Sequence, residues 1–127
     1  MTHRLAVLIS GTGSNLQAIV DAIDAGELPA RISLVLSNKA GAAGLARAER
    51  AGVPAEAIDH RGFPDRAAFD QAMIERIDAH GADTVVLAGF MRILSPGFVR
   101  HYQGRLINIH PSLPKNQHDK KDTYRQP

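Results

Sequence analysis

The sequence predicts an α/β domain built on a doubly wound parallel sheet, and three observations lead to this prediction. Short runs rich in Val, Ile and Leu alternate with longer segments in which apolar residues recur every three or four positions. Gly, Ser or Asp stand where such segments would begin or end as helices. The chain has 127 residues, 44% of them hydrophobic, and no internal repeat, which is typical of one domain with a substantial core. Such alternation is the pattern of repeated βαβ units.

The first strand is predicted over residues 4–9, which are mostly apolar. A turn over residues 10–13 follows and contains two glycines. Ser14 and Gln17 then have the spacing of a capping box, which satisfies free backbone N–H groups at the start of a helix. We therefore expect a helix over residues 14–25 that ends at the following glycine. Its apolar face would consist of residues at helical spacing: Leu16, Ile19, Val20 and Ile23.

The middle of the chain predicts two more strands and a helix between them. Residues 32–36 form an uninterrupted apolar run, which suits a strand buried on both faces. A helix over residues 42–51 follows and ends at a glycine. Residues 53–58 predict a weaker strand that contains Pro54, and we place it toward an edge of the sheet because proline cannot donate a ladder hydrogen bond.

The remaining elements complete the sheet. Asp65 is expected to cap a longer helix, and residues 84–88 form the clearest buried strand of the sequence. Ser95 followed by Pro96 predicts the start of a short helix, and residues 106–109 predict the fifth strand. Five strands with helices between them give a three-layer α/β/α, Rossmann-like sheet with right-handed crossovers. Ligands of such sheets bind at the carboxyl ends of the strands.

Composition excludes several classes of protein and site. The absence of Cys excludes disulfides, thiolate catalysis and Cys-based zinc sites. No apolar run reaches the roughly 18 residues of a membrane span, and no secretory signal is recognisable, so we expect a cytoplasmic protein without a membrane partner. The six His residues show no metal-ligand spacing, so we expect no metal.

The charge is distributed unevenly along the chain. The formal net charge is +2, and residues 1–110 carry 11 basic and 11 acidic side chains, so the whole surplus lies in residues 111–127. That segment is almost free of apolar residues, which predicts a polar, flexible tail after a nucleotide-binding domain over residues 1–110. A surplus this small does not indicate a nucleic-acid partner.

The first loop, from Ser10 to Asn15, has the composition of an anion site. The loop leads into a predicted helix, so its backbone N–H groups would lie at the amino-terminal end of that helix, where anions bind. Gly11 and Gly13 would let the backbone approach a phosphate closely. Leu16 stands where a dinucleotide fingerprint needs Gly, and no acidic residue ends the second strand, so a single phosphate monoester fits better than a dinucleotide. The same glycines would also fit an ordinary tight turn.

Two further loops at the carboxyl ends carry candidate residues. Asn108 and His110 are two residues apart at the end of a strand, so both side chains point to one face. An amide donor and an imidazole could stabilise an oxyanion and move a proton, although the spacing equally fits an ordinary loop histidine. The apolar segment 89–94 would either return to the core or wall a pocket for a flat heterocycle.

Four segments together resemble the phosphoribosylglycinamide formyltransferases of purine biosynthesis. They occur in the family's order from Leu5 to about Leu113. The segments read VLISGTGSNLQAI from Val7, LSNKA from Leu36, VVLAGFMRILSP from Val85 and NIHPSL from Asn108. The last would be shared with other folate-dependent formyltransferases, whereas the combination is specific to this family.

The resemblance implies a formyltransferase-like fold and transfer of a formyl group from 10-formyltetrahydrofolate to the amine of glycinamide ribonucleotide. It implies that the substrate phosphate is held by three residues of the first loop: Gly13, Ser14 and Asn15. It implies that folate is held by six residues: Arg66, Met91, Arg92, Ile93, Leu94 and Asn108. Asn108 would bind the formyl oxygen and His110 would be the proton donor, with no metal involved.

The sequence departs from the family after Lys115. Family members continue with further strands, a long helix and a catalytic Asp that orients the histidine, whereas residues 116–122 match none of these. The pattern is thus the amino-terminal part of the family's, truncated after the fifth strand, and neither Asp119 nor Asp122 takes the role of that Asp. We expect impaired turnover without an oriented imidazole, and self-association through apolar surface that the absent part would cover.

Three functional hypotheses follow from these residues. The first is formyl transfer to glycinamide ribonucleotide. The second is a phosphate-ester binding module without turnover, and the third is a relative that hydrolyses formyltetrahydrofolate to formate. The partners expected are the small molecules glycinamide ribonucleotide and folate.

Overall fold

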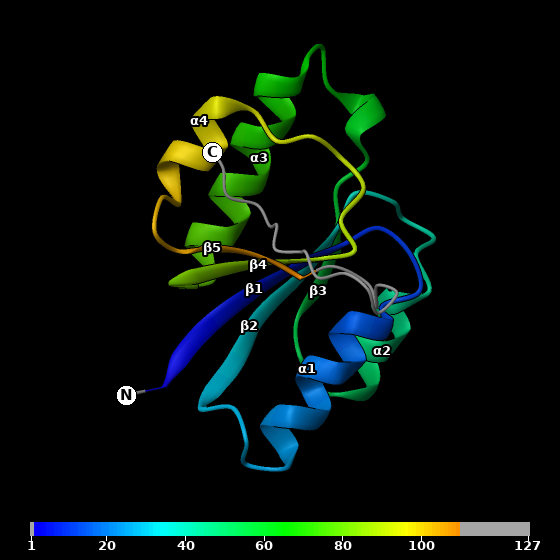
Figure 1. Ribbon diagram of the computed structural model, residues 1–127. Coiled ribbons are helices and arrows are strands. Elements are labelled where there is room, and N and C mark those ends of the chain that lie inside the picture. Colours follow the sequence, from blue (N-terminus) through cyan, green and yellow to red (C-terminus); the bar gives the residue numbers. More distant parts are fainter. Residues whose placement is uncertain (1, 110–127) are drawn as a thin grey trace, which may run out of the picture.

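The protein folds as a five-stranded parallel sheet with helices on both faces. The structure, a computed structural model, describes residues 2–109 (Figure 1). The strands are β1 (His3–Ile9), β2 (Ala30–Ser37), β3 (Ala55–Ala57), β4 (Thr84–Ala88) and β5 (Leu106–Ile109). Their order in the sheet is β3-β2-β1-β4-β5, and every pair is parallel. The predicted doubly wound fold is therefore confirmed.

The helices form the two outer layers. They are α1 (Ser14–Asp24), α2 (Gly44–Arg50), α3 (Arg66–Ala79) and α4 (Pro96–His101), and a 3-10 turn, η1, spans His60–Gly62. In Figure 1, α1 and α2 cover one face of the sheet, and α3 and α4 cover the other. No helix within residues 2–109 is long and apolar enough to cross a membrane.

Alternate residues of β1 supply two separate cores. Val7 and Ile9 pack in a cluster with Leu16 and Ile19 of α1. Ala6 and Leu8 face the other way, into a cluster that includes large side chains of α3 and α4: Phe69, Met73, Ile77, Phe98 and Tyr102. Because β1 is the central strand, it is buried on both faces, which accounts for its uninterrupted apolar run.

Most predicted boundaries and caps are confirmed. Asp65 accepts a hydrogen bond from the backbone N–H of Ala68 at 2.8 Å, and Ser95 caps α4 through the N–H of Phe98 at 3.2 Å. The weak strand lies at the edge of the sheet, as predicted, but it covers only Ala55–Ala57 of the predicted range 53–58, so Pro54 lies just before it.

The predicted capping box at Ser14 and Gln17 is wrong. The N-cap of α1 is Gly13, whose φ of 80° is left-handed, and no side chain of the described part of the chain caps this helix. Ser14 is therefore already inside the helix. The Gln17 side chain instead donates a hydrogen bond to the Asp21 carboxylate at 3.0 Å, and its oxygen accepts one from the Arg47 guanidinium at 3.4 Å. Among residues 2–109, no side chain accepts a hydrogen bond from the backbone N–H groups at the start of α1.

Candidate functional site

The loops that follow the strands meet at one edge of the sheet, because all five strands run in the same direction. Two of the three predicted site segments, residues 10–15 and 89–94, follow the adjacent strands β1 and β4. Asn108 lies on β5 in register with Leu87 of β4, close to the same edge. The predicted His110 and the tail 111–127 lie outside the described residues.

The loop after β1 has its carbonyl groups turned inward. The carbonyl oxygen of Gly11 accepts from the N–H of Gly44 at 2.9 Å, and that of Thr12 accepts from Arg47 Nε at 2.7 Å. The carbonyl oxygen of Gly13 accepts from the N–H of Gln17 at 2.8 Å. By contrast, no backbone N–H from Gly11 to Asn15 finds an acceptor among residues 2–109.

This arrangement suits an anion. Each of the three carbonyl oxygens, which would repel a phosphate, is occupied on the protein side. The unpaired N–H groups sit at the amino-terminal end of an 11-residue helix, where the helix dipole favours negative charge. The loop can therefore donate several hydrogen bonds to one phosphate group.

Two glycines allow this loop to lie against α2. A Cβ atom on Gly13 would lie 2.7 Å from the Cα of Gly44, and one on Gly44 would lie 2.6 Å from Cδ1 of Ile9. Both distances are shorter than real Cβ contacts allow. Gly13 is thus required by tertiary packing as well as by its positive φ.

Within the segment 89–94, some side chains return to the core and others are exposed. Phe90 and Leu94 pack against the core formed with α3 and α4. Met91 and Ile93 are 74% and 75% exposed. The Arg92 guanidinium lies over the ring of Phe69, 4.9 Å from its centroid. Alternate residues therefore anchor the loop, while the others present an apolar surface at the carboxyl edge.

Arg66 makes no side-chain hydrogen bond or ion pair with the residues that the structure describes. It is the first residue of α3 and is exposed. Because α3 follows β3, its amino-terminal end lies at the carboxyl edge of the sheet. The position is compatible with ligand binding, and nothing in its local sequence distinguishes it from an ordinary surface arginine.

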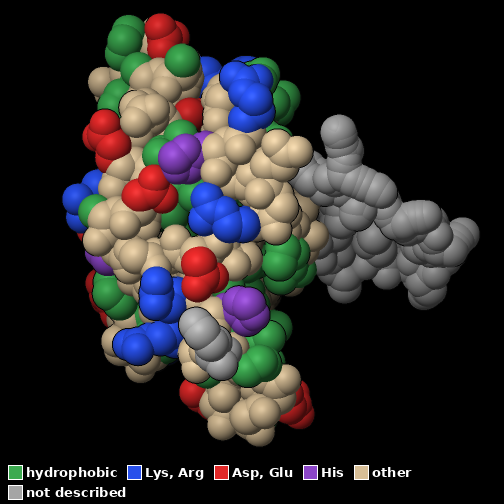
Figure 2. Space-filling view, turned by 90° about the vertical axis from the view of Figure 1, so that its left-hand side faces the viewer, with side chains coloured by type: hydrophobic (Ala, Val, Ile, Leu, Met, Phe, Trp, Pro, Cys, Tyr) green, Lys and Arg blue, Asp and Glu red, His purple; other side chains and the backbone are tan. Residues whose placement is uncertain are grey.

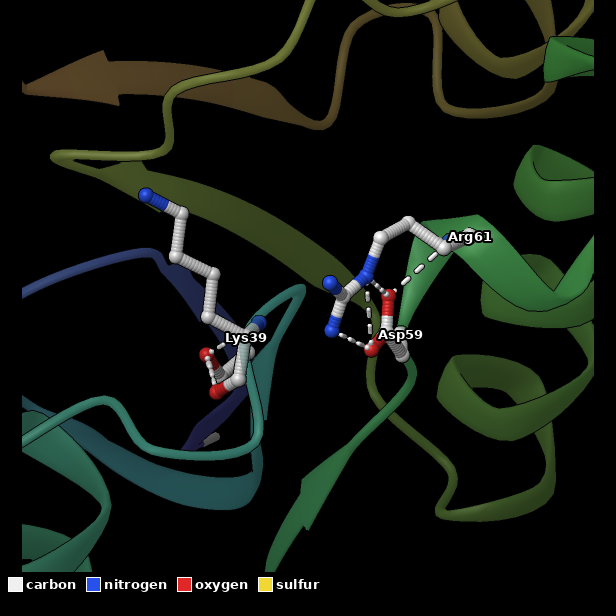
Figure 3. A network of polar contacts seen from close by, with 4 residues as sticks. Lys39, Asp59 and Arg61 are labelled. Carbon is white, nitrogen blue, oxygen red and sulfur yellow. Dashed lines mark hydrogen bonds and ion pairs between the residues drawn. The ribbon is translucent and has the colours of Figure 1, made fainter.

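A cleft borders the loop that follows β1. It has a volume of about 650 Å³ and opens among the loops after β1, β2 and β3. Lys39 and Arg61 stand on opposite sides of it, as Figure 3 shows. The Arg61 side chain donates to both carboxylate oxygens of Asp59, with donor–acceptor distances of 2.7 to 3.2 Å. This pairing holds the pKa of Asp59 well below its usual range.

The charge of the cleft favours an anion. Asp59 is already neutralised by Arg61, so the ammonium of Lys39 leaves a positive surplus beside Gly11 and Thr12. Of the residues that line the cleft, Ser10 to Thr12 belong to the predicted anion loop, and Asn38 and Lys39 belong to the segment LSNKA. Asp59 and Arg61 give no sequence signal, since their role depends on which strand ends are neighbours.

Other surfaces carry mixed charge. On the face shown in Figure 2, acidic and basic side chains are interspersed. No group of three or more potential metal ligands lies within the part of the chain that the structure describes.

Comparison with known proteins places these features in a family. The formyl transferase family profile matches residues 3–118. Phosphoribosylglycinamide formyltransferase of Escherichia coli is 54% identical over 109 residues, which is 86% of this chain and 51% of that protein. The human trifunctional purine biosynthetic protein adenosine-3 is 52% identical over 110 residues, 87% of this chain and 11% of that protein.

Solved structures show the same relationship. Glycinamide ribonucleotide transformylase 1 from Symbiobacterium toebii superposes with a TM-score of 0.84 at 47% identity, covering 91% of this chain and 54% of its own. The phosphoribosylglycinamide formyltransferase of Coxiella burnetii gives a TM-score of 0.84 at 48% identity, and the match covers 92% of this chain and 55% of that protein. The chain thus spans about half the length of the formyltransferase of Escherichia coli and of these solved structures.

Proposed function

The chain belongs to the formyl transferase family, and from this premise we propose that it serves the transfer of a formyl group from 10-formyltetrahydrofolate to the amine of glycinamide ribonucleotide. The observation that carries the proposal is the loop from Gly11 to Asn15, in which the carbonyl oxygens are occupied and the N–H groups are left for an anion. The names of the relatives add the substrate class, because they are glycinamide ribonucleotide transformylases.

In this proposal the phosphate of the substrate binds Gly13, Ser14 and Asn15. A phosphate held at the start of α1 fixes one end of the nucleotide, and this lowers the entropic cost of bringing its amine to the formyl carbon. The positive surplus of the neighbouring cleft adds attraction for the phosphate.

Folate is proposed to bind along the segment 91–94, with Arg66 and Asn108 as further contacts. The exposed side chains of Met91 and Ile93 offer an apolar wall for a flat ring, and the backbone of an anchored loop can read its polar edge. The anchors are Phe90 and Leu94, which are packed against the core.

The chemistry is a direct acyl transfer. The substrate amine attacks the formyl carbon, a new C–N bond forms, and the carbonyl oxygen becomes an oxyanion that the Asn108 amide would stabilise. The bond from that carbon to N10 of the folate then breaks. His110 is proposed to move the proton that leaves the attacking nitrogen toward N10, which needs it as a leaving group.

An assay with both substrates tests this proposal. Formylated glycinamide ribonucleotide should form, and replacing Asn108 by Ala should lower the rate about 100-fold or more, since one oxyanion donor is lost. Formate released without glycinamide ribonucleotide would instead indicate a hydrolase. Saturable nucleotide binding with no product of either kind would indicate a phosphate-ester binding module.

A further inference from the structure

One buried hydroxyl group joins three chain segments at the centre of the carboxyl edge. The Ser10 hydroxyl donates to Asn38 Oδ1 at 2.6 Å, and its oxygen accepts from the backbone N–H of Met91 at 2.8 Å. Ser10 and Asn38 are each 3% exposed. The bond to Asn38 fixes the hydroxyl proton, so the oxygen is left as an acceptor for Met91.

Ser10 occupies the point where the two proposed half-sites meet. It follows β1, whose neighbours in the sheet are β2 on one side and β4 on the other. The next residue, Gly11, begins the phosphate loop. Met91 begins the exposed segment of the proposed folate loop. A single side chain therefore connects the backbone of one loop to the backbone of the other.

The far end of the folate loop is held separately. The N–H of Ser95 donates to the buried carboxylate of Asp70 at 2.6 Å. Between these ties, the Arg92 guanidinium rests on the ring of Phe69. That end is anchored to α3, and the start of the segment is held by the packing of Phe90 and by the hydrogen bond from the Met91 N–H to Ser10.

We propose that Ser10 is a positioning residue that couples the phosphate loop to the segment 91–94. The inference rests on the proposed function for the meaning of the two half-sites, whereas the coupling itself is a property of the hydrogen bonds. A ligand that orders residues 11–15 would shift Ser10, and Ser10 would transmit that shift to the peptide group of Met91. The nucleotide would thereby set the folate loop.

Amide NMR of the whole chain tests the coupling with inorganic phosphate as the probe. In the native protein, phosphate should shift the amide signals of residues 11–15 and also those of Met91 and Arg92. In Ser10→Ala the loop signals should still shift, whereas the Met91 and Arg92 signals should not respond. Ser33→Ala is the matched control, because Ser33 lies on β2 and has no side-chain hydrogen bond within residues 2–109, and it should behave like the native protein.

A second readout does not depend on a bound ligand. Loss of the Ser10 acceptor should raise the hydrogen-exchange rate of the Met91 amide about tenfold relative to Ser33→Ala. If Ser10→Ala does not fold, Asn38→Ala carries the test, since it frees the Ser10 hydroxyl without removing the Met91 acceptor and should weaken the transmitted shift.

The outcomes separate the two claims. Phosphate shifts at residues 11–15 that never reach Met91 in the native protein would overturn the coupling and leave the phosphate site intact. No phosphate shift at all would contradict the proposed function. If phosphate causes no shift, hydrogen exchange still tests the positioning role of Ser10. An unchanged exchange rate of the Met91 amide in Ser10→Ala would overturn that role, and a tenfold increase would support it.

Discussion

Replacing Gly13 by Ala should destabilise the protein and displace the phosphate loop. The residue has a φ of +80°, and a Cβ atom there would lie 2.7 Å from the Cα of Gly44 and 3.2 Å from Cδ of Arg47. The first obstacle is a backbone atom, which cannot rotate away as the end of a side chain could. The variant therefore combines backbone strain with a steric clash.

The two costs can be put into numbers. An alanine in the left-handed region costs about 1 to 2 kcal/mol. Forcing an extra methyl group into a packed contact costs about 1 to 3 kcal/mol. The free energy of unfolding should therefore fall by about 2 to 5 kcal/mol, a large part of the about 5 to 15 kcal/mol typical of a domain.

Two other glycines separate these contributions. Gly26 has a φ of +76° with nothing near its added Cβ atom, so Gly26→Ala should show the strain alone, about 1 to 2 kcal/mol. Gly11 has no positive φ and open space, so Gly11→Ala should leave stability unchanged or raise it by up to about 1 kcal/mol.

Urea unfolding followed by circular dichroism measures all three variants. The expected order of destabilisation is Gly13→Ala, then Gly26→Ala, then Gly11→Ala. Equal losses for Gly13→Ala and Gly26→Ala would refute the clash with α2, because strain alone would then explain both. Phosphate binding should fall in Gly13→Ala and be retained in Gly26→Ala, which lies outside the loop, if the displaced loop is the binding site.

Two further predictions concern stability. Replacing the N-cap Asp65 by Ala should cost about 1 kcal/mol, measured as a lower urea midpoint, and an unchanged midpoint would mean that the cap contributes nothing in solution. The Arg76 guanidinium holds the pKa of Glu56 below its ordinary value of 4.5, chiefly by hydrogen bonding. Because the folded-state pKa is the lower one, the ion pair stabilises the fold above about pH 4.5 and loses this effect as the pH falls through the folded pKa. The pair is partly exposed, so the effect should stay below about 1 kcal/mol. Glu56→Gln should be less stable than the native chain at pH 6, and this difference should shrink as the pH falls through the folded-state pKa. A difference that does not change with pH would contradict this assignment.

The strands and helix ends could be predicted because they depend on local sequence. The buried strand Thr84–Ala88 and the Asp65 cap are examples in which composition and spacing determine the element. The capping box was predicted from the spacing of Ser14 and Gln17 alone. That spacing does not show whether Ser14 or the preceding glycine is the N-cap. Gly13 packs against Gly44, and local spacing holds no information on this contact between residues far apart in the sequence.

The candidate site was predictable in part for the same reason. Parallel topology brings the segments 10–15 and 89–94 to one edge, and this follows from the order of the strands. The hydrogen bonds of Ser10 and the cleft between Lys39 and Arg61 depend on which side chains meet there, and periodicity holds no information on that. The assigned roles of Arg66 and His110 come from family resemblance and remain predictions.

The central claim is that the loop from Gly11 to Asn15 binds the phosphate of glycinamide ribonucleotide. A calorimetric titration of this chain with the nucleotide tests it most directly, with inorganic phosphate as competitor, Asn15→Ala as the loop variant and Ser33→Ala as the matched control. Saturable binding that phosphate displaces, that Asn15→Ala abolishes and that Ser33→Ala retains is the predicted result. Absence of binding by a chain that circular dichroism shows to be folded would contradict the account.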